Sequence, residues 1–571
     1  MMFPLVLFPI LVCQEPAPPS APQAPSIPRH GVVTHTDEAS GGLTLFAPLH
    51  SGTTWLINSE GRAVHSWERS DSPGNSVYLL DNGNLLRCEK FESDASLHGG
   101  GEGGRIVELD WDGNLLWEYE LCTDKQRLHH DIEPLPNGNI LAIVWSARSR
   151  RDVALAGRDP EAVGEEGLWV DSILELKPTR PEGAEIVWQW HAFDHLIQDF
   201  DAERTNHGEV AAHPRRININ IGTHAAAQPE TEDEKKERLE LEKHLRAMGY
   251  AGGDEDDDPD EGRARRRADW MHTNAISYEP ELDLIAISIR SFSEVWVIDH
   301  STSTEEAAGS IGGRQGVGGD LVWRVGNPVQ FHQGRASDRT LFGQHDVRWT
   351  EVGGQSALSI FNNGEGRPEA KYSSVELLIL PVDEEGVFQG LTDKHFVPAT
   401  QQTSWAMPKK EDLYSGHISG AQVLPSGGLL VCDGEGGRLI ETNSKGDLVW
   451  EFISPLGRKP GEGAEDGRGP GGRRGPRSGP PRRGQRPGGP PRGPRGQGPP
   501  PGDGGPRQRG GRGGPSNGNA MFRATRYPLD HPALEGREFT PRDLPKEAIP
   551  QPPGRGERPG PPPGEKVDGA G

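Results

Sequence analysis

Histidines stand in front of four apolar segments that lie far apart in the chain. The four places are residues 128–131, 270–274, 343–346 and 416–419, and they contain His129, His130, His272, His345 and His417. A neutral imidazole can act as a nucleophile or carry a proton. Arg290 follows His272 by 18 residues and offers a planar fork of hydrogen-bond donors that suits the oxygens of an anion. Imidazoles together with one guanidinium would suit the transfer of an anionic group.

A short hairpin is expected to bring His272 and Arg290 together. Residues 283–289 form an apolar run bounded by polar residues, which predicts a buried strand. Pro280 lies in a turn before that strand. His272 would therefore enter the hairpin and Arg290 would leave it, so that both side chains lie at the same end of a sheet.

The composition favours one large all-β repeat architecture. Gly and Pro account for 77 and 51 of the 571 residues. Short runs of Val, Ile, Leu and Trp alternate with Asn-Gly, Ser-Gly and Asp-Gly turns, a pattern typical of β-proteins. The formal net charge is -24, and residues 457–520 contain fourteen Lys or Arg against four Asp or Glu, about +10, so the remainder carries about -34. This charge disfavours nucleic acid as a partner of the main body.

One four-stranded plan recurs six times along the chain. The units begin near residues 42, 77, 130, 272, 344 and 417. A single unit cannot bury its apolar face alone, so six units predict a closed six-bladed β-propeller. The first unit lacks an inner strand, and residues 521–528 are expected to supply it and close the ring. Tryptophans near the ends of the units are expected to pack between neighbouring blades, namely Trp67, Trp117, Trp188, Trp323 and Trp450.

Several segments are expected to lie outside the blades. Residues 191–268 are too long for a connection and are interpreted as a surface insert, in which residues 229–248 predict a helix with charge pairs spaced i,i+4. An Arg/Gly/Pro-rich segment near the C-terminus cannot form a core and is expected to be disordered. The expected divisions are a leader at 1–13, a Pro-rich linker at 14–30, the propeller at 31–456, the disordered segment at 457–520, a closing segment at 521–543 and a disordered tail at 544–571.

The start of the chain resembles a secretory leader, because an uncharged apolar run precedes the Pro-rich linker. We expect a secreted or periplasmic protein, with Cys13 as an alternative site for a lipid anchor. No other run approaches the ~20 apolar residues of a membrane span. The remaining cysteines are odd in number, so they cannot all pair internally; they are Cys88, Cys122 and Cys432. The first and last follow equivalent strand motifs and are expected to be buried, unpaired strand residues.

Several motifs together resemble the bacterial aryl-sulfate sulfotransferase family (arylsulfotransferase, ASST). They are His-His-Asp with Leu-Pro-Asn-Gly-Asn, Asp-Trp-Met-His-Thr-Asn with Ile-Ser-Ile-Arg, Gln-His-Asp-Val with Phe-Asn-Asn-Gly, and Phe-Arg-Ala-Thr-Arg-Tyr-Pro. The likeness covers roughly residues 31–456 and 521–541. It implies a six-bladed periplasmic propeller that moves a sulfuryl group from one phenol to another through a sulfohistidine, without a nucleotide donor or any other cofactor.

The resemblance also implies roles for single residues. His345 would match the transiently sulfated histidine of the family. His272 and Arg290 would match its sulfate-binding pair, and His130 or His129 its fourth site residue. Sulfuryl transfer passes through a flat centre with spread charge, which needs positioning and cationic hydrogen-bond donors. The residue types at these positions suit that need.

A nucleophilic imidazole must be neutral at one nitrogen, and Asp346 or a neighbouring carbonyl could hold the other N–H. We therefore expect one catalytic and one substrate-binding set. They are His345, His272, Arg290 and His130 for catalysis, and His129, Asn274 and His417 for the substrate. The expected partners are a phenolic sulfate donor and a phenolic acceptor, and a homodimer is an open alternative.

Two other interpretations compete with a sulfotransferase. His130, Asp131, His272, His345 and Asp346 could bind a transition metal, although an arginine at the same mouth would repel a cation. A non-catalytic propeller that binds or scaffolds partners in the cell envelope is the main alternative, because fold alone implies no function. Residues 99–104 satisfy a Gly-x-Gly-x-x-Gly pattern, but they open no helix and are assigned to a turn.

Overall fold

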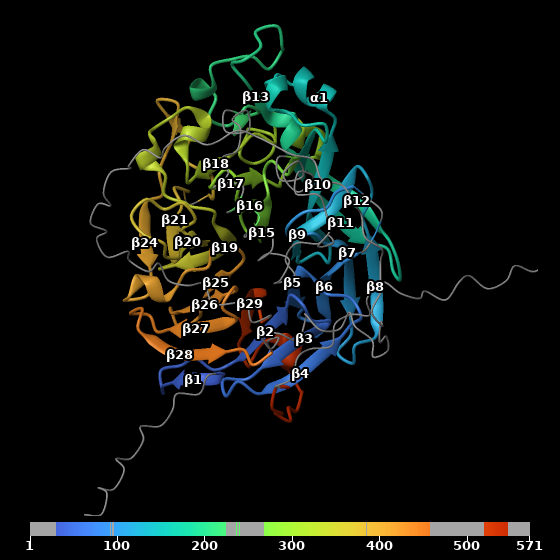
Figure 1. Cartoon of the computed structure of the whole chain (residues 1–571), viewed down its shortest axis with the longest axis vertical. Helices are drawn as coiled ribbons and strands as arrows, with labels where there is room; N and C mark the ends of the chain where they lie inside the picture. The colour runs from blue at the N-terminus through green and yellow to red at the C-terminus, as the bar shows by residue number, and fades with distance from the viewer. Residues whose placement is uncertain are drawn as a thin grey trace, which may run out of the picture.

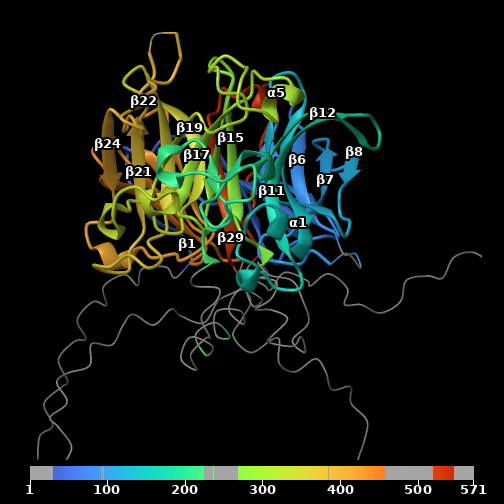
Figure 2. The ribbon, with the colours of Figure 1, turned by 90° about the horizontal axis from the view of Figure 1, so that it is seen from above.

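A computed structural model of the protein consists of six antiparallel sheets arranged as the blades of a ring (Figure 1). The structure describes residues 30–91, 93, 96–223, 236, 239, 268–383, 385–456 and 519–545. The inner strand of each blade contacts the inner strands of both neighbouring blades, so the ring is closed. Figure 2 shows the ring from the side, where most strands run up and down along its axis. The predicted all-β, six-bladed propeller is confirmed.

Each blade is named here with its inner strand first. Blade one consists of β29 (Met521–Tyr527), β2 (Leu43–Pro48), β3 (Thr53–Ile57) and β4 (Ala63–Glu68). Blade two consists of β5 (Pro73–Leu79), β6 (Leu85–Lys90), β7 (Gly104–Leu109) and β8 (Leu115–Glu120). Blade three consists of β9 (Gln126–Pro134), β10 (Ile140–Arg148), β11 (Leu168–Pro178) and β12 (Ala184–His191).

The other three blades follow in chain order. Blade four consists of β15 (Thr273–Glu279), β16 (Leu284–Ile289), β17 (Glu294–Asp299) and β18 (Trp323–Val325). Blade five consists of β19 (His345–Val352), β20 (Gln355–Asn362), β21 (Ser374–Ile379) and β24 (Gln401–Trp405). Blade six consists of β25 (Gly420–Val423), β26 (Leu429–Asp433), β27 (Arg438–Thr442) and β28 (Leu448–Ile453), with β1 (Gly31–His35) added outside β28.

Short elements lie in the connections within and between the blades. They include the helices α1 (Arg150–Leu155) and α5 (Thr304–Ala307) and the two-residue strand pairs β13 (Leu196–Ile197) with β14 (Ile217–Asn218) and β22 (Leu391–Thr392) with β23 (His395–Phe396). Single 3₁₀ turns lie at Pro160–Ala162, Ala192–His195, Val210–Ala212, Pro328–Phe331, Ala336–Asp338, Lys410–Asp412 and Pro532–Leu534. Within the described ranges, no helix has the length and apolar character needed to cross a membrane.

The apolar core is divided into layers between neighbouring blades. Strand β16 illustrates why its sequence is a continuous apolar run. Ile285 and Ile287 pack in the layer shared with blade three, whereas Leu284 and Ala286 pack in the layer shared with blade five. Successive side chains of a strand point to opposite faces. A central strand of a blade is therefore buried on both faces, because each face meets another blade.

Strand β29 joins the end of the described chain to its beginning. It pairs antiparallel with β2, with Leu43 opposite Tyr527 and Phe46 opposite Ala524. Strand β1 makes a second long-range pair with β28, in which Val32 lies opposite Phe452. Both ends of the propeller are thus held by strand pairing.

Tryptophans link each blade to the next around the whole ring. Each sits on the outer strand of its blade and donates its indole N–H to a neighbouring blade or connection. The pairs are Trp67 with Asp110 O, Trp117 with Gly183 O, Trp188 with Thr302 Oγ1, Trp323 with Val397 O, Trp405 with Gly446 O, and Trp450 with Ser59 O. Five of the six were expected from the sequence. Trp405 was missed because the long connection after β21 concealed the fourth strand of blade five.

The segment after β12 differs in part from the surface insert expected at 191–268. Ile217 and Ile219 are fully buried in the largest core layer. Arg158 donates to the carbonyls of Ile219 and Ile221, and the Trp270 indole also donates to Ile221 O at 3.1 Å. Ile217, Ile219 and Ile221 therefore belong to the core beside blade four, whereas Phe200 in the same segment is 56 % exposed, so residues 192–221 are a surface insert only in part.

Several other expectations concern the two ends of the chain, the insert and the cysteines. The helix expected at 229–248, the leader, the linker and residues 457–518 lie outside the described residues, apart from His30 and isolated positions. Leu544, the first residue of the expected tail, is buried in the layer between blades six and one. Cys88, Cys122 and Cys432 are all free thiols, and the first and last are buried as expected.

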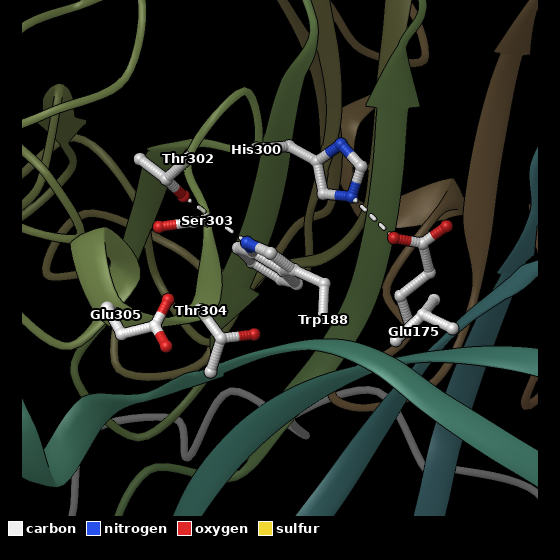
Figure 3. Close-up of a pocket in the computed structure, with 8 residues that line it drawn as sticks. Glu175, Trp188, His300, Thr302, Ser303, Thr304 and Glu305 are labelled. Atoms are coloured by element: carbon white, nitrogen blue, oxygen red, sulfur yellow. Dashed lines mark hydrogen bonds and ion pairs between the residues drawn. The ribbon is translucent and has the colours of Figure 1, made fainter.

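A pocket between blades three and four is lined by an ion-paired histidine, His300 (Figure 3). His300 lies between Asp283 Oδ1 at 2.7 Å and Glu175 Oε2 at 3.2 Å. Burial alone would lower the pKa of His300, but the two carboxylates raise it to about 9. The His300 imidazolium therefore links β11 of blade three to the β15–β16 hairpin of blade four by two ion pairs.

We expect the two ion pairs of His300 to make the free energy of unfolding depend on pH. The pKa of His300 is higher in the folded than in the unfolded protein. The ion pairs of His300 therefore contribute fully to the free energy of unfolding below about pH 6.5, and this contribution is lost as the pH rises through about 9. The free energy of unfolding should fall by about 2 kcal/mol over this range, after allowance for partial solvent screening. Denaturant unfolding of the wild type and of His300→Gln at both ends of the range measures it. An equal pH effect in the two proteins would contradict the assignment.

Candidate active site

Backbone bulges aim the candidate side chains at one end of the ring. The inner strands of blades three, four and five each shift register near the residues of interest. Left-handed residues mark these positions and the start of blade six, namely His130 (φ 54°), His272 (φ 52°), Asp346 (φ 51°) and Ile418 (φ 47°). A non-glycine residue in this region is strained and persists where the surroundings hold it. The bulges turn side chains from several blades toward a common point.

The histidines of blades three, four and five form one cluster with Arg290. The rings of His130 and His272 lie 4.5 Å apart, nearly perpendicular. Burial holds the pKa of His130 well below its usual value, and the charges of His272, His129, His345 and Arg290 lower it further. These residues were expected to meet from their positions at strand starts. The structure brings them together.

His345 is fully buried, and its tautomer follows from its partners. Asn363 Nδ2 donates to the carbonyls of Ser415 and Ile418, so its Oδ1 faces His345 Nδ1 at 2.8 Å. Nδ1 therefore carries the proton, with Gly343 O as a second acceptor at 3.2 Å. Nε2 then presents a lone pair, toward which the Ile418 N–H points at 3.2 Å. The imidazole is neutral and its nucleophilic nitrogen is defined.

The environment of His345 keeps it neutral at physiological pH. Burial holds its pKa well below the usual value, and the charge of Arg290 lowers it further. Of the two supports left open by the sequence, a neighbouring carbonyl is present and Asp346 is not. Asp346 instead pairs with Arg348 at 2.9 Å and with Arg523 at 3.2 Å. The bulge at Asp346 turns this carboxylate toward the channel interior, away from the imidazole.

His272 and Arg290 lie at the open end of their hairpin, as expected. Thr273 pairs with Ile289, and the Arg290 N–H donates to His272 O at 3.3 Å. His272 Nδ1 lies 2.5 Å from Asp269 Oδ2, and the other oxygen of this carboxylate accepts the Trp145 indole N–H at 3.2 Å. This buried support fixes the orientation of the His272 ring.

Arg290 reaches the mouth of the channel beside an acidic side chain. Its NH2 donates to Glu365 Oε2 at 2.6 Å. The Arg290 side chain is 23 % exposed and that of Glu365 is 44 % exposed. The Arg290 guanidinium is thus partly exposed to solvent, and its charge also lowers the pKa of His345. An incoming anion would meet Arg290 while Glu365 competes for it.

The residues expected to contact substrate lie in different surroundings. His129 stacks on Trp145 at 4.3 Å, and its Nδ1 lies 2.8 Å from His130 Nδ1, so it supports His130 from behind. Asn274 is fully buried and donates to Gln344 O at 2.8 Å, next to His345. His417 is also buried, and its Nδ1 is 2.6 Å from Oε1 of the partly exposed Glu435. Of the three, His417 is the one whose partner contacts solvent.

Sequence reasoning assigned no role to several residues of the site. Asn363 lies in the Phe-Asn-Asn-Gly motif, and Asp269 lies three residues before His272, so both stood inside recognised motifs. Glu365 and Glu435 follow Gly-rich turns after strands and carried no local signal. Residues 99–104 were assigned to a plain turn, but Gly101 O accepts the His130 N–H at 2.7 Å. A Cβ at Gly101 would lie 2.0 Å from His130 Nε2, so a larger residue would displace the imidazole.

The carboxylates proposed as metal ligands are engaged elsewhere. Asp131 accepts hydrogen bonds from Tyr78, Ile132 N and Ile276 N and pairs with Arg523 at 2.5 Å. Within the described part of the chain, no group of three or more His, Cys, Asp or Glu side chains is arranged to hold a metal ion. The cluster brings several imidazoles together with one guanidinium, which suits an anionic group.

A model of the arylsulfotransferase (ASST) family matches residues 36–445 of the chain. The chain belongs to the arylsulfotransferase family. The resemblance inferred from the motifs is thereby confirmed. Aryl sulfotransfer is the activity class of this family, and small aryl compounds are its substrates. No curated protein matches the chain significantly.

Several solved structures with low sequence identity resemble the fold of this arylsulfotransferase. A Bacteroides caccae protein of unknown function has 10 % identity and a TM-score of 0.34, covering 72 % of this chain and 94 % of its own. A Pseudomonas aeruginosa periplasmic gluconolactonase has 9 % identity and a TM-score of 0.33, with 73 % and 97 % covered. Virginiamycin B lyase from Staphylococcus aureus has 8 % identity and a TM-score of 0.30, with 74 % and 87 % covered.

Proposed function

We propose that this arylsulfotransferase moves a sulfuryl group from a phenolic sulfate ester to a phenolic acceptor through a sulfohistidine at His345. The observation that carries the proposal is the state of His345. Its Nδ1–H is held by Asn363 and Gly343, so Nε2 is the unprotonated nitrogen, and the Ile418 N–H that it accepts at 3.2 Å has to give way before attack. A neutral imidazole with a fixed tautomer beside an anion-binding guanidinium fits nucleophilic attack on a sulfate ester.

The reaction has two half-steps. In the first, the Nε2 lone pair forms an N–S bond while the S–O bond to the aryl group breaks, and the phenolate oxygen leaves with the electron pair. In the second, the oxygen of the acceptor phenol attacks sulfur, the N–S bond breaks, and Nε2 recovers its lone pair. Donor and acceptor therefore use the same site in turn. The sulfuryl donor is a phenolic ester, so no nucleotide is needed.

Arg290, His272 and His130 are proposed to hold the sulfuryl oxygens. The guanidinium offers a planar pair of donors, and its charge offsets the charge that spreads over these oxygens in the transition state. Asp269 orients His272 through a 2.5 Å contact, and Gly101 and His129 orient His130 through backbone and ring contacts. Preorganised donors need little rearrangement as the charge develops.

An acceptor assay tests the proposal. Purified protein is incubated with 4-nitrophenyl sulfate, with and without added phenol. We expect phenol to increase the release of 4-nitrophenol and phenyl sulfate to form in equal amount. If release does not depend on phenol and no phenyl sulfate forms, the protein is not a transferase of this kind, and a binding or scaffold role becomes the better interpretation.

Glu365 is expected to weaken donor binding by competing for Arg290. Its carboxylate lies 2.6 Å from the guanidinium and repels a sulfate that approaches the same group. We expect Glu365→Gln to lower the KM for an aryl sulfate roughly 2- to 10-fold, a modest effect because the pair is partly exposed to solvent.

Steady-state kinetics of the variant measures the change. Glu351→Gln removes an exposed carboxylate elsewhere in blade five and serves as the matched control. An unchanged or raised KM in Glu365→Gln would mean that Glu365 orients Arg290 and does not compete for it.

We also propose that the enzyme acts in the periplasm or as a secreted protein, because an uncharged apolar run precedes a Pro-rich linker at residues 1–30. Cell fractionation tests this location. Recovery of the active protein in the cytoplasmic fraction alone would contradict it.

A further inference from the structure

The transfer proposed above leaves the proton of the phenol without a carrier. A phenol has a pKa of about 10 and is protonated at neutral pH. The acceptor must therefore lose its proton as it attacks, and the departing phenolate of a weakly acidic phenol must gain one. Nδ1–H of His345 is held by Asn363 at 2.8 Å and Gly343 at 3.2 Å, so this ring does not serve as the carrier.

His417 and Glu435 form a histidine–carboxylate pair next to the nucleophile. His417 Nδ1 lies 2.6 Å from Glu435 Oε1, and the same oxygen accepts the His417 backbone N–H at 3.2 Å. The carboxylate holds both the ring and the backbone of His417, which fixes the direction in which Nε2 points. The next residue, Ile418, donates its N–H to His345 Nε2 at 3.2 Å. His417 is therefore the residue directly before the backbone N–H that contacts Nε2 of His345, the nitrogen that attacks sulfur.

The backbone around this pair is held by a dense set of hydrogen bonds. Ile418 and Ser419 are both left-handed, with φ values of 47° and 80°, so the chain turns sharply after His417. Ser415 Oγ donates to His417 O at 3.0 Å and accepts from Ser419 Oγ at 2.7 Å and from the Glu435 N–H at 3.4 Å. Strain of this kind persists where neighbouring contacts fix it, often at functional sites.

The nucleophile and the pair share one support. Asn363 accepts the proton of His345 Nδ1 and donates to Ser415 O and Ile418 O, the residues on either side of His417. Movement of His345 is thereby coupled to the loop that carries His417. Glu435 is 23 % exposed in its side chain, whereas His417 is 6 % exposed, so the buried imidazole lies between the cluster and a partly exposed carboxylate. A phenol oxygen bound beside His345 would lie next to this pair.

We propose that His417, oriented by Glu435, is the general acid and base that exchanges the phenolic proton. This inference rests on the proposed function. In the first half-step the His417 imidazolium gives its Nε2 proton to the departing phenolate oxygen as the S–O bond breaks. In the second half-step neutral His417 takes the proton of the acceptor phenol as its oxygen attacks sulfur. The cycle closes, because one proton has passed from acceptor to leaving group.

The dependence on the leaving group tests this role. 4-Nitrophenol is acidic enough to leave without a proton, whereas phenol is not. We expect His417→Gln to lower kcat/KM for phenyl sulfate about 10²- to 10³-fold and that for 4-nitrophenyl sulfate by less than about 10-fold. Glu435→Gln keeps the size of the side chain, and we expect the same preference with a smaller loss of about 10-fold for phenyl sulfate. A merely structural role would lower the rates for both donors alike.

The wild type and a matched variant serve as controls. His395→Gln changes an exposed histidine on β23 and should alter neither rate. Thermal unfolding of all three variants checks folding. Equal losses for the two donors in both His417→Gln and Glu435→Gln, or no loss in either, would overturn the acid–base role while leaving the transferase function standing. If the wild type itself transfers no sulfuryl group to phenol, the proposed function and this inference fall together.

Discussion

We expect His345→Gln to abolish sulfuryl transfer, with kcat reduced by about 10⁴-fold or more. The reason is that the contacts of His345 fix its tautomer with Nε2 unprotonated, as a nucleophile requires. A glutamine can still hydrogen-bond to Asn363, but its amide is not a nucleophile. Intact-peptide mass spectrometry after a short incubation with aryl sulfate should find one added sulfuryl group on the wild-type peptide that contains His345 and none on the variant.

The loss must be separated from unfolding. Removal of the imidazole alters the hydrogen bonds of buried polar groups around it, which lowers the free energy of unfolding by about 1–3 kcal/mol. The variant should therefore still fold, with a lower midpoint of thermal unfolding. The exposed His395→Gln variant controls for the loss of a histidine. If His345→Gln keeps a tenth or more of the wild-type rate, or if the sulfuryl group appears on a different histidine, His345 is not the nucleophile.

Arg523→Met is expected to give the largest loss of stability. Arg523 on β29 bridges two fully buried carboxylates near the axis of the ring, Asp131 at 2.5 Å and Asp346 at 3.2 Å. Burial raises the pKa of Asp131 even with this arginine present. Without it, two buried charges lose their common partner, and removal of one partner of a buried ion pair costs about 3–5 kcal/mol. Denaturant unfolding at pH 7 measures the change.

The pH dependence gives this prediction its sign. In the variant the folded pKa of Asp131, which burial already raises, should lie further above its unfolded value, so this carboxylate destabilises the fold increasingly as the pH rises. The difference from the wild type should therefore shrink as the pH is lowered. Arg150→Met removes an exposed pair with Glu165 and should change stability by less than about 0.5 kcal/mol. A loss as small as this in Arg523→Met would show that the bridge adds no stability.

Local sequence patterns determined the blades and one half of the site. Short apolar runs and Gly-containing turns specify strands and hairpins over a few residues, because a strand between two blades is buried on both faces. The same local logic predicted that His272 and Arg290 meet, since both flank one hairpin. The inter-blade tryptophans also followed from the repeat, because a large apolar side chain at an outer strand has to be covered by the next blade.

The partners of the site residues depended on the tertiary structure. A regular strand would place His345 and Asp346 on opposite faces, but the bulge decides what each one meets, and Asn363 takes the position beside His345. Glu365 and Glu435 reach Arg290 and His417 from connections whose local sequence does not specify their direction. Arg523 comes to Asp131 across 392 residues of chain, because β29 pairs with β2. Contacts between distant segments form only when the ring closes, so the sequence determined which groups were available and the closed fold decided which of them meet.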